Sequence, residues 1–220
     1  MKEKTIENSR KNISYYGLLV TGDSNWLRIT REDTGQVVSI AKYTRAKNME
    51  IKGSGAKKRE HFIIDDWPYK NVKASVKALP DSRSRFGPVD YNVGASLYFE
   101  SSKNLLTVNP SGIQVKAGID PYAKLKPGTY GVFLPDAPHK DGQGYLDRTG
   151  YALTWFFIKD DDNLDRYVHC GARSLGCVTV GESSIGGSNH DIKRWTEIAE
   201  FLSTQRVPSN NNFVGYLKVV

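Results

Sequence analysis

The sequence has few of the residues on which several classes of protein depend. Two cysteines and four histidines occur among its 220 residues, with neither paired C-x-x-C segments nor an H-E-x-x-H motif. A disulfide framework and a metal site are therefore not expected, and nothing in the sequence indicates a cofactor. No run of 18 apolar residues occurs either, so we expect no membrane-spanning helix.

The N-terminal region lacks the features of an ordinary export signal. Its first apolar run, YYGLLV at 15–20, is too short for the core of a signal peptide. The segment before this run carries both signs of charge. The sequence therefore does not predict export by the usual route.

An excess of basic residues gives the chain a net charge of +7. The basic clusters at 44–60 and 82–87 lack the aromatic spacing and the glycine pattern of nucleic-acid-binding modules. We therefore expect a solvated basic surface and no nucleic-acid partner.

Short apolar or alternating runs separated by turn residues are spread along the chain, and this pattern is typical of strands. Segment 189–206 differs, because its apolar residues recur at helical spacing on one face. Ser188 or Asn189 is suited to cap this helix, with Asp191 near its positive end. The sequence predicts a mainly β (α+β) fold with one C-terminal amphipathic helix. The expected strand segments are 26–33, 36–43, 61–67, 95–109, 112–118, 128–135, 151–160, 166–171, 176–181 and 213–220.

Two polar, glycine-bearing stretches interrupt the strand pattern, at 52–60 and 79–94. The second is the better linker candidate, so we place a domain boundary near residue 88. Residues 1–88 are then a small β-rich module of unknown role, and residues 89–220 form the main domain.

The segment DRYVHCGARSLGCVTVGE, at 165–182, contains both cysteines, one histidine and three glycines. His169 lies near the end of one predicted strand, and Cys177 begins the next. Neighbouring strands lie about 4.8 Å apart, so a tight return loop can bring the thiol beside the imidazole. A thiol whose thiolate is stabilised by a nearby base is a nucleophile. Gly176 allows a substrate to approach the backbone, and Gly171 and Gly176 both permit unusual dihedral angles.

Other interpretations of this segment remain open. Cys177 is also compatible with a small buried core residue, and a Cys170–Cys177 disulfide is a further alternative. His169 shares a strand face with Tyr167, as a core histidine would. A non-catalytic β domain that binds cell-wall glycan or a protein partner is the competing functional class. In that class the features to examine are the tryptophans, because exposed indoles stack on sugars: Trp26, Trp67, Trp155 and Trp195.

His169 followed by SLGCVTV resembles the signature of the L,D-transpeptidase (YkuD-like) family, in which a histidine precedes a Ser/Thr-His-Gly-Cys run. The resemblance extends upstream to segments 97–118 and 124–133. Leu175 stands where most members have histidine, and the interval between histidine and cysteine is shorter than usual. Such shortened motifs occur in a branch that resembles the L,D-transpeptidase-like effectors delivered by type VI secretion.

The resemblance implies a YkuD-like β-sandwich or open barrel that acts on peptidoglycan stem peptides. Cys177 would be the nucleophile and His169 the base, with Gly171 orienting the ring through its carbonyl. The N–H groups of Gly176 and Cys177 would stabilise the oxyanion. The substrate contacts implied are Arg173, Ser174, Tyr151 and His139.

Membership of the effector branch would also imply partners and a location. The partners would be an immunity protein or a component of a secretion apparatus, in addition to the stem peptide. The protein would be cytoplasmic until a signal-independent route delivers it to a periplasm or cell wall.

Overall fold

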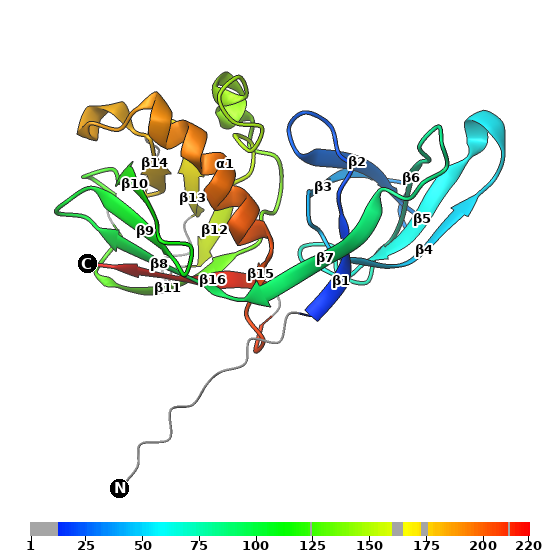
Figure 1. The fold of residues 1–220 in the computed structure, drawn as a ribbon, viewed down its shortest axis with the longest axis horizontal. Helices are drawn as coiled ribbons and strands as arrows, with labels where there is room; N and C mark the ends of the chain where they lie inside the picture. The colour runs from blue at the N-terminus through cyan, green and yellow to red at the C-terminus, as the bar shows by residue number, and fades with distance from the viewer. Residues whose placement is uncertain (1–12, 124, 160–164, 173–175, 211) are drawn as a thin grey trace, which may run out of the picture.

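The computed structural model describes residues 13–123, 125–159, 165–172, 176–210 and 212–220. Strands dominate it, as the sequence predicts, and they form two groups (Figure 1). In the first group, antiparallel pairing gives a five-stranded sheet in the order β3-β2-β6-β5-β4. Alternate residues of these strands point into a shared apolar core that includes Ile29, Phe62 and Ile64. The strands are β2 (Trp26–Arg31), β3 (Val37–Ala41), β4 (Ala46–Lys52), β5 (Arg59–Ile64) and β6 (Lys73–Lys77).

The second group is a closed barrel in the order β10-β14-β13-β12-β11-β16-β8-β9. The ring closes because β9 pairs with both β8 and β10. Two neighbouring pairs are parallel, β13 with β14 and β16 with β8, and the remaining pairs are antiparallel. The strands are β8 (Ala95–Glu100), β9 (Leu105–Asn109), β10 (Ile113–Gly118), β11 (Gly128–Phe133), β12 (Phe156–Lys159), β13 (Arg166–Cys170), β14 (Val178–Val180) and β16 (Phe213–Val219).

The predicted helix is α1 (Asn189–Ser203), which lies across the barrel strands in Figure 1. Ser188 is its N-cap, and Ser188 and Asp191 form a reciprocal capping box, a device that stabilises a helix by about 1 kcal/mol. The apolar face is buried as the spacing predicts. Its buried residues include Ile192, Trp195, Ile198, Ala199 and Leu202.

Strand β7 (Phe86–Val93) lies between the two groups of strands (Figure 1). It pairs antiparallel with β1 (Ile13–Leu18) and parallel with β15 (Gln205–Arg206). Pro88, at the expected boundary, is inside β7 and not in a loop. One apolar cluster draws on residues 18–86 and another on residues 95–219. The division into two modules remains a prediction, to be tested by the proteolysis described below.

A buried cluster of charges joins the first group of strands to β15. Asp66 accepts hydrogen bonds from the Arg45 guanidinium, at 2.7 Å, and from Nη2 of Arg206 in β15, also at 2.7 Å. Burial opposes the charge of Asp66, but the two arginines outweigh it and lower the pKa of the carboxyl. Removing one partner of such a cluster leaves an uncompensated buried charge.

Three short 3-10 helices complete the described chain: η1 (Gly55–Lys57), η2 (Lys140–Tyr145) and η3 (Ser183–Ile185). Across the described ranges, no helix has the length and apolar character needed to cross a membrane. The same residues contain no group of three or more His, Cys, Asp or Glu side chains that could hold a metal ion.

Candidate functional site

Two neighbouring parallel strands bring His169 and Cys177 to one face of the barrel wall. His169 of β13 is paired with Thr179 of β14, and the two side chains are in contact, with Nε2 of His169 3.3 Å from the Thr179 hydroxyl. Cys177 precedes Thr179 by two residues, so their side chains point to the same side. The thiol and the imidazole therefore share a face, on adjacent segments.

The backbone fixes the orientation of the His169 ring. Nδ1 lies 3.0 Å from the carbonyl oxygen of Cys170, and because a carbonyl only accepts, Nδ1 is the donor. Nε2 then carries the lone pair, which is the arrangement that a general base needs. The sequence-based prediction named the carbonyl of Gly171 for this role, but the carbonyl that accepts from the ring is that of Cys170. The N–H of Gly171 instead donates to the carbonyl of Val180 in β14.

Burial keeps the His169 imidazole neutral. The side chain is only 1% exposed, and this desolvation lowers its pKa from 6.5 to about 4. The nearby His139 lowers it further, while the hydrogen bond to Cys170 acts in the opposite direction. At neutral pH the ring is therefore neutral, and the same burial opposes the imidazolium that proton transfer would form.

Aromatic rings hold the imidazole in place. Trp155 stacks on His169 with ring centroids 3.9 Å apart, and His139 stacks on Trp155 at 4.5 Å. Asp136 accepts hydrogen bonds from Nε2 of His139 and from the hydroxyl of Tyr167. His139, which we expected as a substrate contact, is therefore one layer of this stack.

Cys177 lies in the same aromatic surroundings and is 3% exposed. It packs with Trp155 and Tyr167, and the partly buried Phe157 borders this group. Cys170 lies in the main barrel core instead, where burial raises its pKa to about 12. The two cysteines form no disulfide in the structure, so the crosslink alternative is not realised here.

The side chain of Arg166 lies against Gly176, the residue before Cys177. Arg166 was not among the residues expected at this site. A Cβ atom on Gly176 would lie 3.0 Å from Nη1 of Arg166 and 3.1 Å from Cζ, so the guanidinium lies directly against this glycine. Gly176 also has a φ of 75°, which side chains rarely adopt. Nη1 of Arg166 donates to the carbonyl of Ala123 at 2.9 Å. The signal available in the sequence was an arginine at the start of an otherwise apolar strand.

Of the other expected substrate contacts, Tyr151 is the one that the structure describes. It is buried in the main core, and its hydroxyl donates to a carboxylate oxygen of Glu200 in α1 at 3.0 Å. A role in substrate binding stays a prediction for this residue. Arg173 and Ser174 lie outside the described residues.

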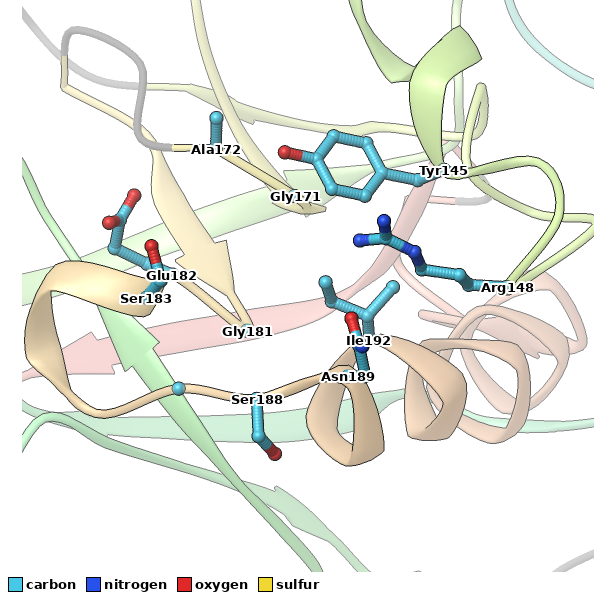
Figure 2. Close-up of a pocket in the computed structure, with 11 residues that line it drawn as sticks. Tyr145, Arg148, Gly171, Ala172, Gly181, Glu182, Ser183, Ser188, Asn189 and Ile192 are labelled. Carbon is cyan, nitrogen blue, oxygen red and sulfur yellow. The ribbon is translucent and has the colours of Figure 1, made fainter.

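A cavity of about 270 Å³ opens at the C-terminal ends of β13 and β14 (Figure 2). Tyr145 and Arg148 line it on one side, and the start of α1 lines it below. His169 and Cys177 are not among its lining residues, although Gly171, two positions after His169, is. Sequence patterns do not predict this cavity, because its walls come from three separate segments.

Comparisons with known proteins find similar solved structures, among them two L,D-transpeptidases. The first is L,D-transpeptidase 1 of Mycobacterium tuberculosis, with a TM-score of 0.34 and 11% identity over 80% of this chain and 98% of that chain. The second is an L,D-transpeptidase from M. tuberculosis H37Rv, with a TM-score of 0.31 and 11% identity over 78% of this chain and 76% of that chain. No protein-family profile and no curated protein sequence matches the chain.

Proposed function

We propose that the protein is a cysteine-nucleophile acyl transferase that acts on peptidoglycan stem peptides. The observation that supports the proposal is the pairing of His169 in β13 with Thr179 in β14, two residues after Cys177, together with the hydrogen bond that orients the His169 ring. The choice of substrate comes from the resemblance of the His169 and SLGC segment to the L,D-transpeptidase signature.

The proposed reaction begins with transfer of the Cys177 proton to Nε2 of His169. The sulfur attacks the carbonyl between the third and fourth residues of the stem, and the N–H groups of Gly176 and Cys177 stabilise the oxyanion. The C–N bond breaks as His169 returns the proton to the departing amine. An incoming amine or a water molecule then releases the thioester, giving a crosslink, an exchanged D-amino acid or a shortened stem.

Incubation with a purified stem tetrapeptide, followed by mass analysis, tests the proposal. We expect loss of the fourth residue, or its replacement when a D-amino acid is added. Cys177→Ala should reduce turnover by about a thousandfold or more, because it deletes the covalent step. Cys170→Ala is the matched control and should leave most of the activity. Equal losses from both substitutions, with both variants folded, would contradict this assignment.

A non-catalytic role is the second candidate, and the burial of both side chains favours it. In that case the domain binds cell-wall glycan or a protein, and Cys177 is an inert packing residue. Alkylation of the intact protein near neutral pH separates the two functions. Rapid modification of Cys177 supports the enzyme, whereas a thiol that reacts only after unfolding supports the binding domain.

A role as a secreted antibacterial effector is part of the same proposal. It would require delivery to a periplasm or cell wall without an ordinary signal peptide, and an immunity protein in the producing cell. Expression of the protein with and without an added periplasmic signal tests this role. Toxicity confined to the periplasmic form, and lost in Cys177→Ala, is the expected result.

A further inference from the structure

A row of basic side chains crosses the outer face of the five-stranded sheet. Arg59 of β5 lies directly opposite Lys52 of β4 and Lys77 of β6. Continued by two residues, the antiparallel register of β2 with β6 places Arg28 opposite Lys77. The row therefore runs from β2 through β6 and β5 to β4, and β4 and β5 lie at the end of the molecule away from the barrel (Figure 1). Alternate residues of β2, β5 and β6 point to the opposite face, into the apolar core: Leu27, Ile29, Phe62, Ile64, Ala74 and Val76.

The guanidinium of Arg59 is held across the sheet by neutral groups. Its Nε donates to the hydroxyl of Ser75 at 3.0 Å, and its Nη2 donates to the hydroxyl of Thr30 at 3.1 Å. Nη2 also donates to the carbonyl oxygen of Ser75 at 3.1 Å. Because these acceptors carry no charge, they fix the position of the guanidinium and leave its positive charge uncompensated.

Acidic residues compensate little of the charge of this row. In the described ranges, no ion pair engages Arg28 or Lys77. Lys52 pairs with Glu50 of its own strand at 2.9 Å, but both side chains are more than half exposed, so solvent screens the pair. Other carboxylates near these strands bind partners outside the row: Glu32 binds His61, Asp33 binds Arg31 and Asp65 binds Lys47.

The row lowers the stability of the sheet, and a bound polyanion would remove this cost. Like charges that lie directly opposite each other on neighbouring strands are destabilising. Neighbouring strands are about 4.8 Å apart, so the four positions span about 14 Å, more than a single phosphate group covers. We infer that the row binds a linear phosphodiester polymer without bases, of the poly(glycerol phosphate) type, which lies across β2, β6, β5 and β4. Successive phosphates of such a polymer accept charge-assisted hydrogen bonds from successive cations.

The outer face favours this polymer over other polyanions. Among the residues of β2, β5 and β6 that share this face, the aromatic one is Trp26, which is buried and donates to Thr154, so bases would have no ring on which to stack. Three of the four cations lie on interior strands, where an acidic peptide cannot add as a further strand. The cations also form a line and not a broad patch, which suits a chain better than a membrane surface.

Titration calorimetry with the full-length protein tests the site. The probe is purified poly(glycerol phosphate), and glycerol 3-phosphate is the monomer control. Oligothymidylate, polyglutamate and phosphatidylglycerol vesicles, matched in concentration of anionic groups, represent the other classes of polyanion. We expect the probe to bind about tenfold or more tightly than the monomer and more tightly than each of the other polyanions. Its affinity should fall by about tenfold or more between about 50 and 200 mM salt, because each phosphate contact releases counterions.

Matched variants locate the polymer on the row. Lys77→Gln and Arg28→Gln should each weaken binding by about threefold or more in low salt, because each removes one phosphate contact. Each should also reduce the slope of log affinity against log salt concentration by about one. Lys70→Gln is the control, because Lys70 is an exposed lysine in the connection between β5 and β6, at the ends of these strands away from the row. This substitution should change neither quantity.

Repulsion within the row gives a second measurement that needs no ligand. Lys77→Gln should raise the melting temperature in low salt, because it relieves the repulsion from Arg59, and added salt should remove the difference. Lys70→Gln should leave the melting temperature unchanged.

Three results would overturn the inference. They are absence of polymer binding by the folded protein, binding of another polyanion as tight as that of the polymer, and equal effects of Lys77→Gln and Lys70→Gln on polymer binding. The row lies on the first group of strands, so these results do not depend on the proposed function.

Discussion

The guanidinium of Arg166 lies against the Cα of Gly176, one residue before the thiol of Cys177. A Cβ at position 176 would force Arg166 to shift by a few tenths of an ångström, next to the backbone N–H groups that we propose as oxyanion donors. Arg166 is itself 4% exposed and bonded to Ala123, so it cannot move aside without breaking other contacts.

Gly176→Ala should therefore slow the alkylation of Cys177 and lower the free energy of unfolding. The positive φ alone costs about 1–2 kcal/mol for a residue with a side chain. Gly186→Ala is the matched control, because Gly186 has a φ of 79° and no atom within 4 Å of its Cβ position. If Gly176→Ala lowers the free energy of unfolding more than Gly186→Ala does, the difference measures the contact with Arg166. Equal losses would show that the contact with Arg166 has no effect.

The neutral state of His169 predicts how stability depends on pH. Between pH 6.5 and about 4 the imidazole is protonated in the unfolded chain but not in the folded protein, so the unfolded state binds more protons. Stability should thus fall as the pH falls through this window, by up to about 3 kcal/mol from this residue. Urea unfolding of the wild type and of His169→Gln, compared at pH 7 and pH 4, measures the difference. The variant should lose less stability than the wild type over this range. Parallel curves for the two proteins would contradict the assigned burial.

The buried carboxylate of Asp66 predicts a large effect of a small substitution. Asp66→Asn keeps the shape of the side chain but leaves Arg45 and Arg206 without a counter-charge, which should cost about 3–5 kcal/mol. Asp33→Asn removes the partner of Arg31 in a solvent-screened surface pair and should cost much less. Thermal unfolding of both variants tests this contrast. A loss at Asp66 no greater than at Asp33 would show that the cluster does not contribute to stability.

The predicted boundary between modules can be tested by limited proteolysis. Arg83 is exposed and lies just before β7, so the first internal cut by trypsin should follow it. The fragments should remain together on size exclusion, because β1 pairs with β7 and Asp66 binds Arg206 across the cut. Early cleavage elsewhere, or immediate separation of the fragments, would argue against this organisation.

Helix α1 and most barrel strands could be predicted from the sequence, because each depends on a pattern of neighbouring residues. The apolar spacing and capping residues of α1 were sufficient to place it, and so were the alternating runs of most barrel strands. Strand β7 was missed because its Gly87, Pro88 and Asn92 are typical of turns. It is a strand because it pairs with β1 and β15, which are far away in the sequence.

The same distinction applies to the site. The sequence predicts that His169 and Cys177 lie close together, because only eight positions separate them, and their separation stays a prediction. The stack of His139 and Trp155 on the imidazole was not predicted, because tertiary packing alone brings these rings together.

The position of β16 in the barrel affects the order of events during biosynthesis. This strand lies between β8 and β11. Strand β8, the first of the barrel in the sequence, therefore gains its parallel neighbour only after residues 213–219 have been synthesised. The five-stranded sheet has no such dependence, because its strands lie within residues 26–77. On the ribosome the N-terminal sheet can therefore form while the barrel is still incomplete. The barrel wall that contains Cys177 therefore closes only after β16 has been synthesised.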